Sequence, residues 1–204
     1  EMCIRDSQLI NNVLFVVDRK DPNLYHPRIA VQNEPVYESL TPSEKTAFDQ
    51  LYTHYFYHRH NDFWYHEAMK KLPELTDSTR MLVCGEDLGM IPDCVKGVMD
   101  ELRILSLEIQ RMPKNPAETF GDPAHYPYRS VCTISTHDMS TLRGWWHEDA
   151  NLTRRYFYDV LGGWGDYPTE APGWLCDSIV LKHLLGNSML CILSLQDWLS
   201  INEE

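Results

Sequence analysis

The chain has 204 residues and a mass of 23.9 kDa, enough for one large domain or two small ones with a sizeable core. Hydrophobic residues make up 43% and charged residues 24% of the sequence, which excludes the disordered and fibrous classes. The formal net charge of −12 disfavours nucleic acid and anionic membrane surfaces as partners, because so acidic a chain repels polyanions. No apolar run approaches the roughly 20 residues that a membrane span needs, and no signal-peptide pattern is visible.

The six cysteines are widely spread and form no CxxC pair. Cys84, Cys132 and Cys191 lie in apolar runs, where a free thiol packs as a small hydrophobic side chain. This usage predicts reduced thiols and a cytoplasmic location. Residues 1–7 show no periodicity that links them to the rest of the chain, so we expect them to be extraneous to the fold. We also expect the sequence to be a piece of a longer protein.

Residues 8–80 contain one strand signal and one long helical signal. A strand is predicted over residues 13–17, and a turn-rich stretch comes after it. The segment Thr41-Pro42-Ser43-Glu44 is a capping box with proline at the first helical position. Helical spacing of apolar residues then continues until Leu72-Pro73, which predicts one long helix or two short ones.

Residues 81–204 alternate between strand and helix signals. Strands are predicted over residues 81–84, 105–109, 131–135 and 190–195, and helices over residues 92–102, 139–148, 152–161 and 177–185. The first of these strands is a short continuous apolar run, which predicts burial on both faces. This order predicts an α/β fold with right-handed crossovers and a parallel sheet. Four such strands are half of an eight-stranded barrel, which typically takes about 250 residues.

Acidic residues come after three of the predicted strands. Glu86, Asp138 and Asp197 lie beyond the first, third and fourth strand, respectively. The carboxyl ends of parallel barrel strands converge on one pocket, and the cleavage of a glycosidic bond needs an acid and carboxylates that stabilise positive charge. Acids at strand ends are also common as turn or cap residues. Both interpretations stay open at this point.

His54 and His58 are four residues apart, which is metal-ligand spacing, but the sequence offers no third ligand beside them, so no metal site is predicted. The aromatic stretch around them either packs a helix on the sheet or lines a sugar groove. The groove candidates are Arg59, His60, Asn61 and Trp64. Trp145 has the same two interpretations, and Arg111 either reaches the pocket or pairs with a structural acid.

Two segments resemble signature segments of the amylomaltase family, the 4-alpha-glucanotransferases of glycoside hydrolase family 77. They are GEDLGMIP at residues 85–92 and THDMST at residues 136–141, with GWW at 144–146. Further similarity lies in YHPRI (25–29), YHRHNDFW (57–64), EIQRMP (108–113) and LQD (195–197). Together these segments cover nearly everything from about residue 12 to residue 199.

The resemblance implies an organisation and a set of residue roles. Residues 81–204 are the second half of a (β/α)8 barrel, strands five to eight, and residues 8–80 are a hairpin and largely helical insertion of the catalytic domain. Glu86 is the general acid/base, Asp138 is the second acid that stabilises the transition state, and His137 binds sugar hydroxyls. Substrate-binding roles are further predicted for Asp87, Arg111, Trp145 and Asp197. The partners are an alpha-1,4-glucan or maltooligosaccharide donor and a sugar acceptor, with no cofactor.

The family's nucleophilic aspartate lies after the fourth strand in an Arg-x-Asp-His motif, and this sequence contains no such motif. A retaining mechanism needs that group roughly 5–5.5 Å from the acid/base carboxyl. We therefore expect the nucleophile upstream of this chain and the isolated chain to be inactive. Two other functions stay open: an alpha-amylase-like glycoside hydrolase and a non-catalytic glucan-binding segment.

Overall fold

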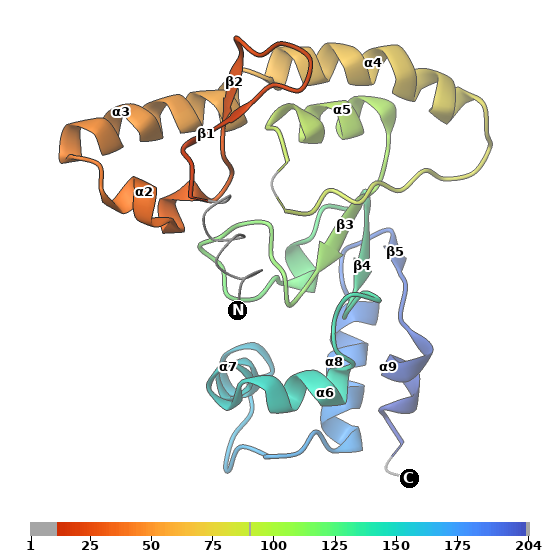
Figure 1. The fold of residues 1–204 in the computed structure, drawn as a ribbon. Helices are drawn as coiled ribbons and strands as arrows, with labels where there is room; N and C mark the ends of the chain where they lie inside the picture. The colour runs from red at the N-terminus through yellow and green to blue at the C-terminus, as the bar shows by residue number, and fades with distance from the viewer. Residues whose placement is uncertain (1–11, 90, 203–204) are drawn as a thin grey trace. The chain divides into compact units, whose positions relative to one another are not determined.

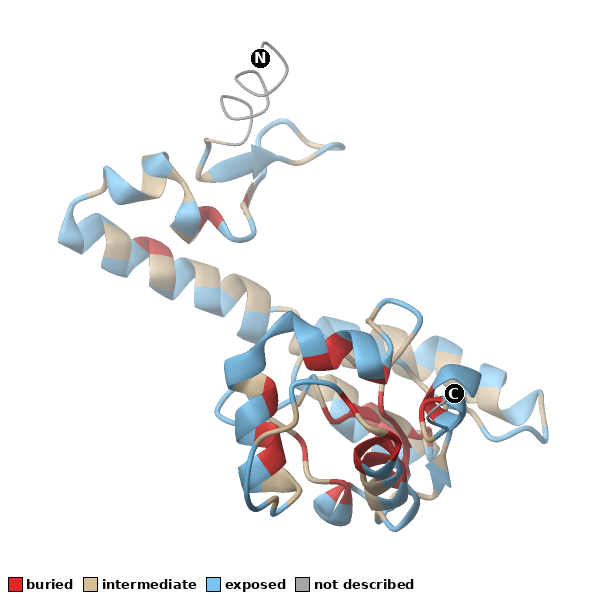
Figure 2. Ribbon diagram, turned by 90° about the horizontal axis from the view of Figure 1, so that it is seen from below, coloured by how far each residue is buried: buried red, intermediate tan, exposed pale blue. Residues whose placement is uncertain are grey.

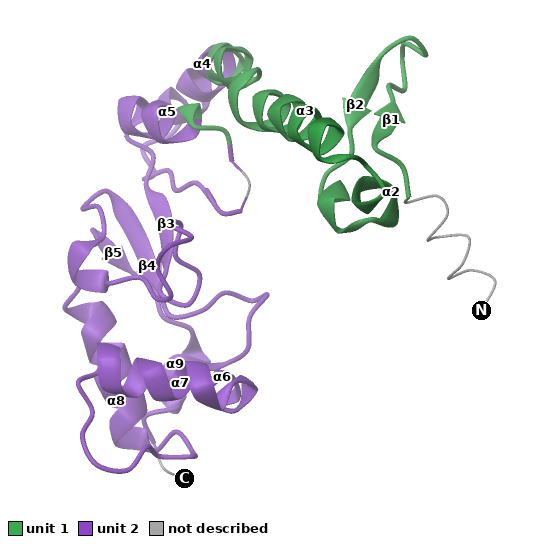
Figure 3. Cartoon of the chain, turned by 90° about the vertical axis from the view of Figure 1, so that its left-hand side faces the viewer, with its two compact units in different colours: residues 1–68, 92–94 green, residues 69–91, 95–204 purple. Residues whose placement is uncertain are grey.

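The structure is a computed structural model that describes residues 12–89 and 91–202. Residues 1–7, which the sequence predicts to be extraneous, lie outside the described residues. The chain divides into two compact units, residues 1–68 with 92–94 and residues 69–91 with 95–204 (Figure 3). Most buried residues belong to the second unit (Figure 2).

The first unit begins with an antiparallel hairpin of β1 (Phe15–Val17) and β2 (Tyr25–Pro27). Asp18 closes the turn, because its carboxylate accepts the backbone N–H groups of Lys20 and Asp21. The same carboxylate lies 2.7 Å from Nε2 of His26, and Nδ1 of His26 lies 2.6 Å from the Tyr55 hydroxyl. This chain of polar contacts fastens the hairpin to the helical segment that carries Tyr55.

Five helical elements come after the hairpin: η1 (Val31–Asn33), α2 (Pro35–Glu38), α3 (Pro42–Thr53), η2 (His54–His58) and α4 (Asn61–Asp77). The predicted capping box at Thr41 and Glu44 is confirmed at the start of α3. The predicted stop at Pro73 is wrong, because α4 continues through it to Asp77. The φ of proline is compatible with a helix, so the loss of one hydrogen bond and the clash of its ring with the preceding turn do not end α4.

The second unit contains a parallel sheet with the order β3-β4-β5 (Figure 1). Its strands are β3 (Ser106–Ile109), β4 (Ser130–Thr133) and β5 (Leu190–Cys191). The helices are α5 (Cys94–Leu102), η3 (Pro123–His125), α6 (Leu142–Glu148), α7 (Ala150–Arg155), η4 (Tyr156–Val160), α8 (Gly173–Leu184) and α9 (Leu195–Leu199). The predicted α/β fold and parallel sheet are confirmed.

The predicted strand over residues 81–84 is reduced to a single parallel bridge between Cys84 and Leu105. The expected burial on both faces is also wrong, since Met81 is 77% exposed and both Leu82 and Cys84 are exposed. In the part of the chain that the structure describes, this segment has a strand partner on the Leu105 side alone. Its side chains therefore lack the neighbours that would cover them.

The predicted strand over residues 190–195 is likewise too long, because β5 ends at Cys191 and Leu195 begins helix α9. Ser194 and Asp197 form a capping box there, in which each side chain accepts the other residue's backbone N–H. Asp197 therefore lies in the first turn of a helix and not at a strand end.

An apolar core under the helices holds the second unit together. Its members include Trp146 and Tyr156, which are almost fully buried, and Leu175 and Ile179 of α8 contribute to the same cluster. Helix α8 lies against β4, where the thiol of Cys132 approaches the carbonyl of His183. Within residues 12–89 and 91–202, no helix is both long and apolar enough to cross a membrane.

Candidate active site

The parallel sheet brings several predicted site segments to one edge. Strands β3 and β4 run in the same direction, and the bridge at Cys84 is parallel as well. The loops that follow these three segments therefore begin at the carboxyl edge of the sheet, and they carry Glu86, Arg111 and Asp138.

His137 and Asp138 lie on the loop between β4 and α6. Their side chains are 88% and 77% exposed, and Nε2 of His137 lies 3.3 Å from Oδ2 of Asp138. Thr136 shapes this loop, because its hydroxyl accepts the N–H of Asp138 and its carbonyl accepts the N–H of Met139. The loop thus presents an imidazole and a carboxylate together to the solvent.

Glu86 is exposed to solvent. Among residues 12–89 and 91–202, no hydrogen bond or ion pair of its carboxylate is observed, and none links it to Asp138. Its predicted role as the acid/base stays a prediction. The neighbouring Asp87 behaves differently, because it is buried and engaged with protein groups.

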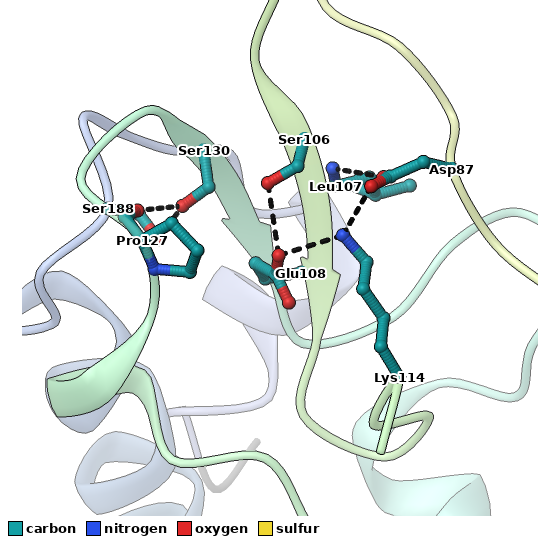
Figure 4. A network of polar contacts seen from close by, with 8 residues as sticks. All are labelled: Asp87, Ser106, Leu107, Glu108, Lys114, Pro127, Ser130 and Ser188. Atoms are coloured by element: carbon teal, nitrogen blue, oxygen red, sulfur yellow. Dashed lines mark hydrogen bonds and ion pairs between the residues drawn. The ribbon is translucent and has the colours of Figure 1, made fainter. Parts of the chain in front are cut away.

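Lys114 joins Asp87 to Glu108 at the side of β3 (Figure 4). Its Nζ lies 2.7 Å from Oδ2 of Asp87 and 2.8 Å from Oε1 of Glu108. The other carboxylate oxygen of Asp87 accepts the backbone N–H of Leu107, and the Ser106 hydroxyl donates to Glu108. Asp87 therefore fastens the chain immediately after Glu86 to strand β3.

A cavity of about 1010 Å³ borders this network within the second unit. Its lining combines charged and aromatic side chains, among them Asp87, Glu108, Lys114, Phe120, Tyr126 and Tyr128. Burial is the main cause of a pKa of Tyr126 that lies far above its ordinary value. The sequence holds no signal for Lys114, because it lies in a proline-rich loop whose spacing is not typical of a site.

Arg111 lies just after β3 and reaches across the sheet edge to the loop of Asp138. Its Nε donates to the carbonyl of Ile134, and its Nη2 donates to the carbonyl of Ser140 at 2.7 Å. The guanidinium lies 5.1 Å from the ring centroid of Trp145, which is only 4% exposed. Burial is the main cause of a lowered pKa for Arg111, although an arginine remains charged.

Asp197 is fully buried, and its Oδ2 accepts the N–H and the hydroxyl of Ser194. Its Oδ1 has no hydrogen-bond partner among the described residues. The observed contacts of Asp87, Arg111, Trp145 and Asp197 are all with protein groups, and their substrate-binding roles stay predictions. Over the same described ranges, no group of three or more His, Cys, Asp or Glu residues is placed to hold a metal ion.

A parallel sheet with acids along its carboxyl edge is an arrangement on which α/β enzymes build active sites. The sequence model of the family described as 4-alpha-glucanotransferase matches residues 14–204. The chain therefore belongs to this family, glycoside hydrolase family 77.

Curated relatives carry the same description. The chain is 38% identical over 196 residues to 4-alpha-glucanotransferase DPE2 of Oryza sativa subsp. japonica, covering 96% of this chain and 21% of that protein. It is 33% identical to 4-alpha-glucanotransferase of Haemophilus influenzae, covering 52% of this chain and 14% of that protein. The protein of that name from Chlamydia trachomatis is 39% identical, with 45% and 18% covered. The chain thus spans about a fifth of these relatives or less.

A solved structure of amylomaltase from Streptococcus agalactiae in complex with acarbose also aligns with the chain. The two are 17% identical, the alignment covers 62% of this chain and 26% of that chain, and the TM-score is 0.48.

Proposed function

We propose that this chain supplies the acid/base part of a retaining 4-alpha-glucanotransferase. The observation that carries the proposal is the family match over residues 14–204. The match includes the loops with Glu86 and Asp138, which begin at the carboxyl edge of the parallel sheet. Glu86 is the general acid/base in this proposal, and Asp138 is the carboxylate that stabilises the transition state.

In the proposed architecture, residues 81–204 form strands five to eight of a (β/α)8 barrel, and residues 8–80 form an insertion. The order of the parallel strands supports this proposal. The bridge at Cys84 adds one segment beside β3, so four parallel segments are neighbours in chain order, as in a barrel wall.

The proposed chemistry is a double displacement. An aspartate from another part of the longer protein attacks the anomeric carbon while Glu86 protonates the leaving glycosidic oxygen, and a covalent glycosyl ester forms. Glu86 then takes the proton of an acceptor 4-hydroxyl, whose oxygen attacks the anomeric carbon and displaces the aspartate carboxylate, so the original configuration is restored. Asp138 stabilises the oxocarbenium-like charge in both steps, and His137 binds hydroxyls of the reacting glucose.

The proposed donor is an alpha-1,4-glucan or maltooligosaccharide, and the acceptor is a second sugar. The names of the curated relatives support this substrate class. No cofactor is needed in this scheme, because carboxyl groups perform each proton transfer and bond exchange. We propose a cytoplasmic location, in keeping with the unpaired cysteines of the described residues.

The test is Glu86→Gln in the full-length protein, assayed by disproportionation of maltooligosaccharides. We expect transfer to fall by about 10²–10⁴-fold, the usual contribution of a general acid/base. Asp159→Asn, a change at an exposed acid of η4, is the matched control and should leave transfer unchanged. Near-normal transfer by Glu86→Gln would end the assignment of Glu86 as the acid/base. Release of glucose without longer products by the unmodified protein would favour the alpha-amylase-like hydrolase.

A further inference from the structure

The loop that carries His137 and Asp138 has few contacts of its own. Both side chains are mostly exposed, and two hydrogen bonds to Thr136 hold the turn. A carboxylate that stabilises charge must keep its place to within a fraction of an ångström during the reaction. Another part of the molecule must therefore hold this loop.

Arg111 contacts both ends of the loop at once. Its Nε donates to the Ile134 carbonyl at 3.2 Å, where the loop leaves β4, and its Nη2 donates to the Ser140 carbonyl at 2.7 Å, where the loop approaches α6. Its Nη1 lies 3.4 Å from the Ser140 hydroxyl. Because the guanidinium is a rigid planar fork, these bonds fix the separation of the two carbonyl groups.

Trp145 keeps the guanidinium in this position. The indole belongs to the buried core of the second unit, and the charged group lies over its face. Three of the five N–H groups of Arg111 are used on the loop. The guanidinium therefore packs on the core, and most of its N–H groups already donate to protein acceptors.

We propose that Arg111 is a positioning residue that clamps the segment 134–140 and thereby holds His137 and Asp138 in their working geometry. This inference rests on the proposed function, since it assigns the clamp to the same site. Arg111 acts through the loop and need not touch the sugar.

The first arm of the test measures amide hydrogen exchange of residues 135–140 in the full-length protein. We expect Arg111→Met to accelerate exchange there by about tenfold or more, because both ends of the loop lose their tether. Arg143→Met is the matched control, since Arg143 also donates to two carbonyls, those of Ser200 and Asn202, outside this loop. Unchanged exchange in Arg111→Met would overturn the clamp.

The second arm measures transfer kinetics with the same variants. Displacement of Asp138 should lower kcat by about 100-fold, whereas KM should change by less than about threefold. Arg111→Lys keeps a positive charge and N–H donors on a single nitrogen, so it should recover part of kcat even if Arg111→Met folds poorly. A raised KM with unchanged kcat would instead make Arg111 a direct sugar ligand and overturn the proposal.

The two arms separate this inference from the proposed function. If the unmodified protein transfers no glucan, the proposed function fails. In that case the exchange measurement still decides whether Arg111 holds the loop. If transfer occurs but neither kcat nor exchange responds to Arg111→Met, only the clamp fails.

Discussion

Lys114 lies between two carboxylates that are nearly buried and would repel each other without it. Lys114→Met should lower the free energy of unfolding by about 2 kcal/mol, because it leaves Asp87 and Glu108 without their charged partner. Urea denaturation measures this change. Adding Glu108→Gln to the variant should recover part of the loss, since it removes one of the unpaired charges. An unfolding energy that Lys114→Met leaves unchanged would contradict a structural role for the network.

Asp18 gives the hairpin a defined response to acid. The hydrogen bond with His26 is the main cause that lowers the pKa of Asp18 from 3.8 to about 2, and the N–H groups of Lys20 and Asp21 add to it. Because the folded pKa lies below the unfolded value, the stabilisation is fully present above pH 4 and is lost as the pH falls towards 2.

The hairpin amides of β1 and β2 should therefore report a transition in that window when monitored by NMR. Asp18→Asn should remove the transition, because the amide does not titrate there. A transition of unchanged midpoint in the variant would assign the effect to another acid.

The sequence predicts site residues at Glu86 and Asp138 because acids come after predicted strands, and the family resemblance adds His137. It did not reveal the contacts of Lys114 or Arg111. Each reaches side chains or carbonyls far away in the chain, Lys114 to Asp87 and Arg111 to Ser140. Such pairings depend on how loops return to the sheet, and local spacing carries no information about that return.

Helix α3 illustrates an element whose start is encoded locally. Thr41→Ala should lower the free energy of unfolding by about 1 kcal/mol, because the hydroxyl accepts the N–H of Glu44 in the first turn of the helix. Thr46→Ala in the same helix is the matched control and should change stability by less than about 0.5 kcal/mol. Thermal or urea unfolding measures both. If both changes lower the free energy of unfolding equally, the capping hydrogen bond of Thr41 does not stabilise the protein.

Strands proved harder to predict than helix starts. The apolar runs at residues 81–84 and 190–195 are typical of strands, yet a strand exists only where a neighbour supplies hydrogen bonds. Residues 81–84 have one bridge, and β5 has two residues. In contrast, the predicted capping box at Thr41 is satisfied within a few residues, so local sequence is enough to form it.

At the scale of the whole chain, the second unit has an open strand edge at the segment before Cys84. The segment before Cys84 presents apolar side chains next to backbone groups that pair on one side alone among the described residues. An exposed, apolar strand edge is a template for pairing with another chain. We therefore expect the isolated 204-residue chain to self-associate with increasing concentration.

Leu82→Lys tests whether this edge is responsible. Leu82 is 52% exposed beside the bridge, and a lysine there places a charge where a second strand would dock, so self-association should fall. Leu185→Lys is the matched control, because Leu185 is 75% exposed at the end of α8 and lies outside the segment 81–84. Sedimentation velocity over a range of concentrations compares the three proteins. If both variants reduce association equally, general surface hydrophobicity is the cause, and a monodisperse unmodified chain would contradict the open edge altogether.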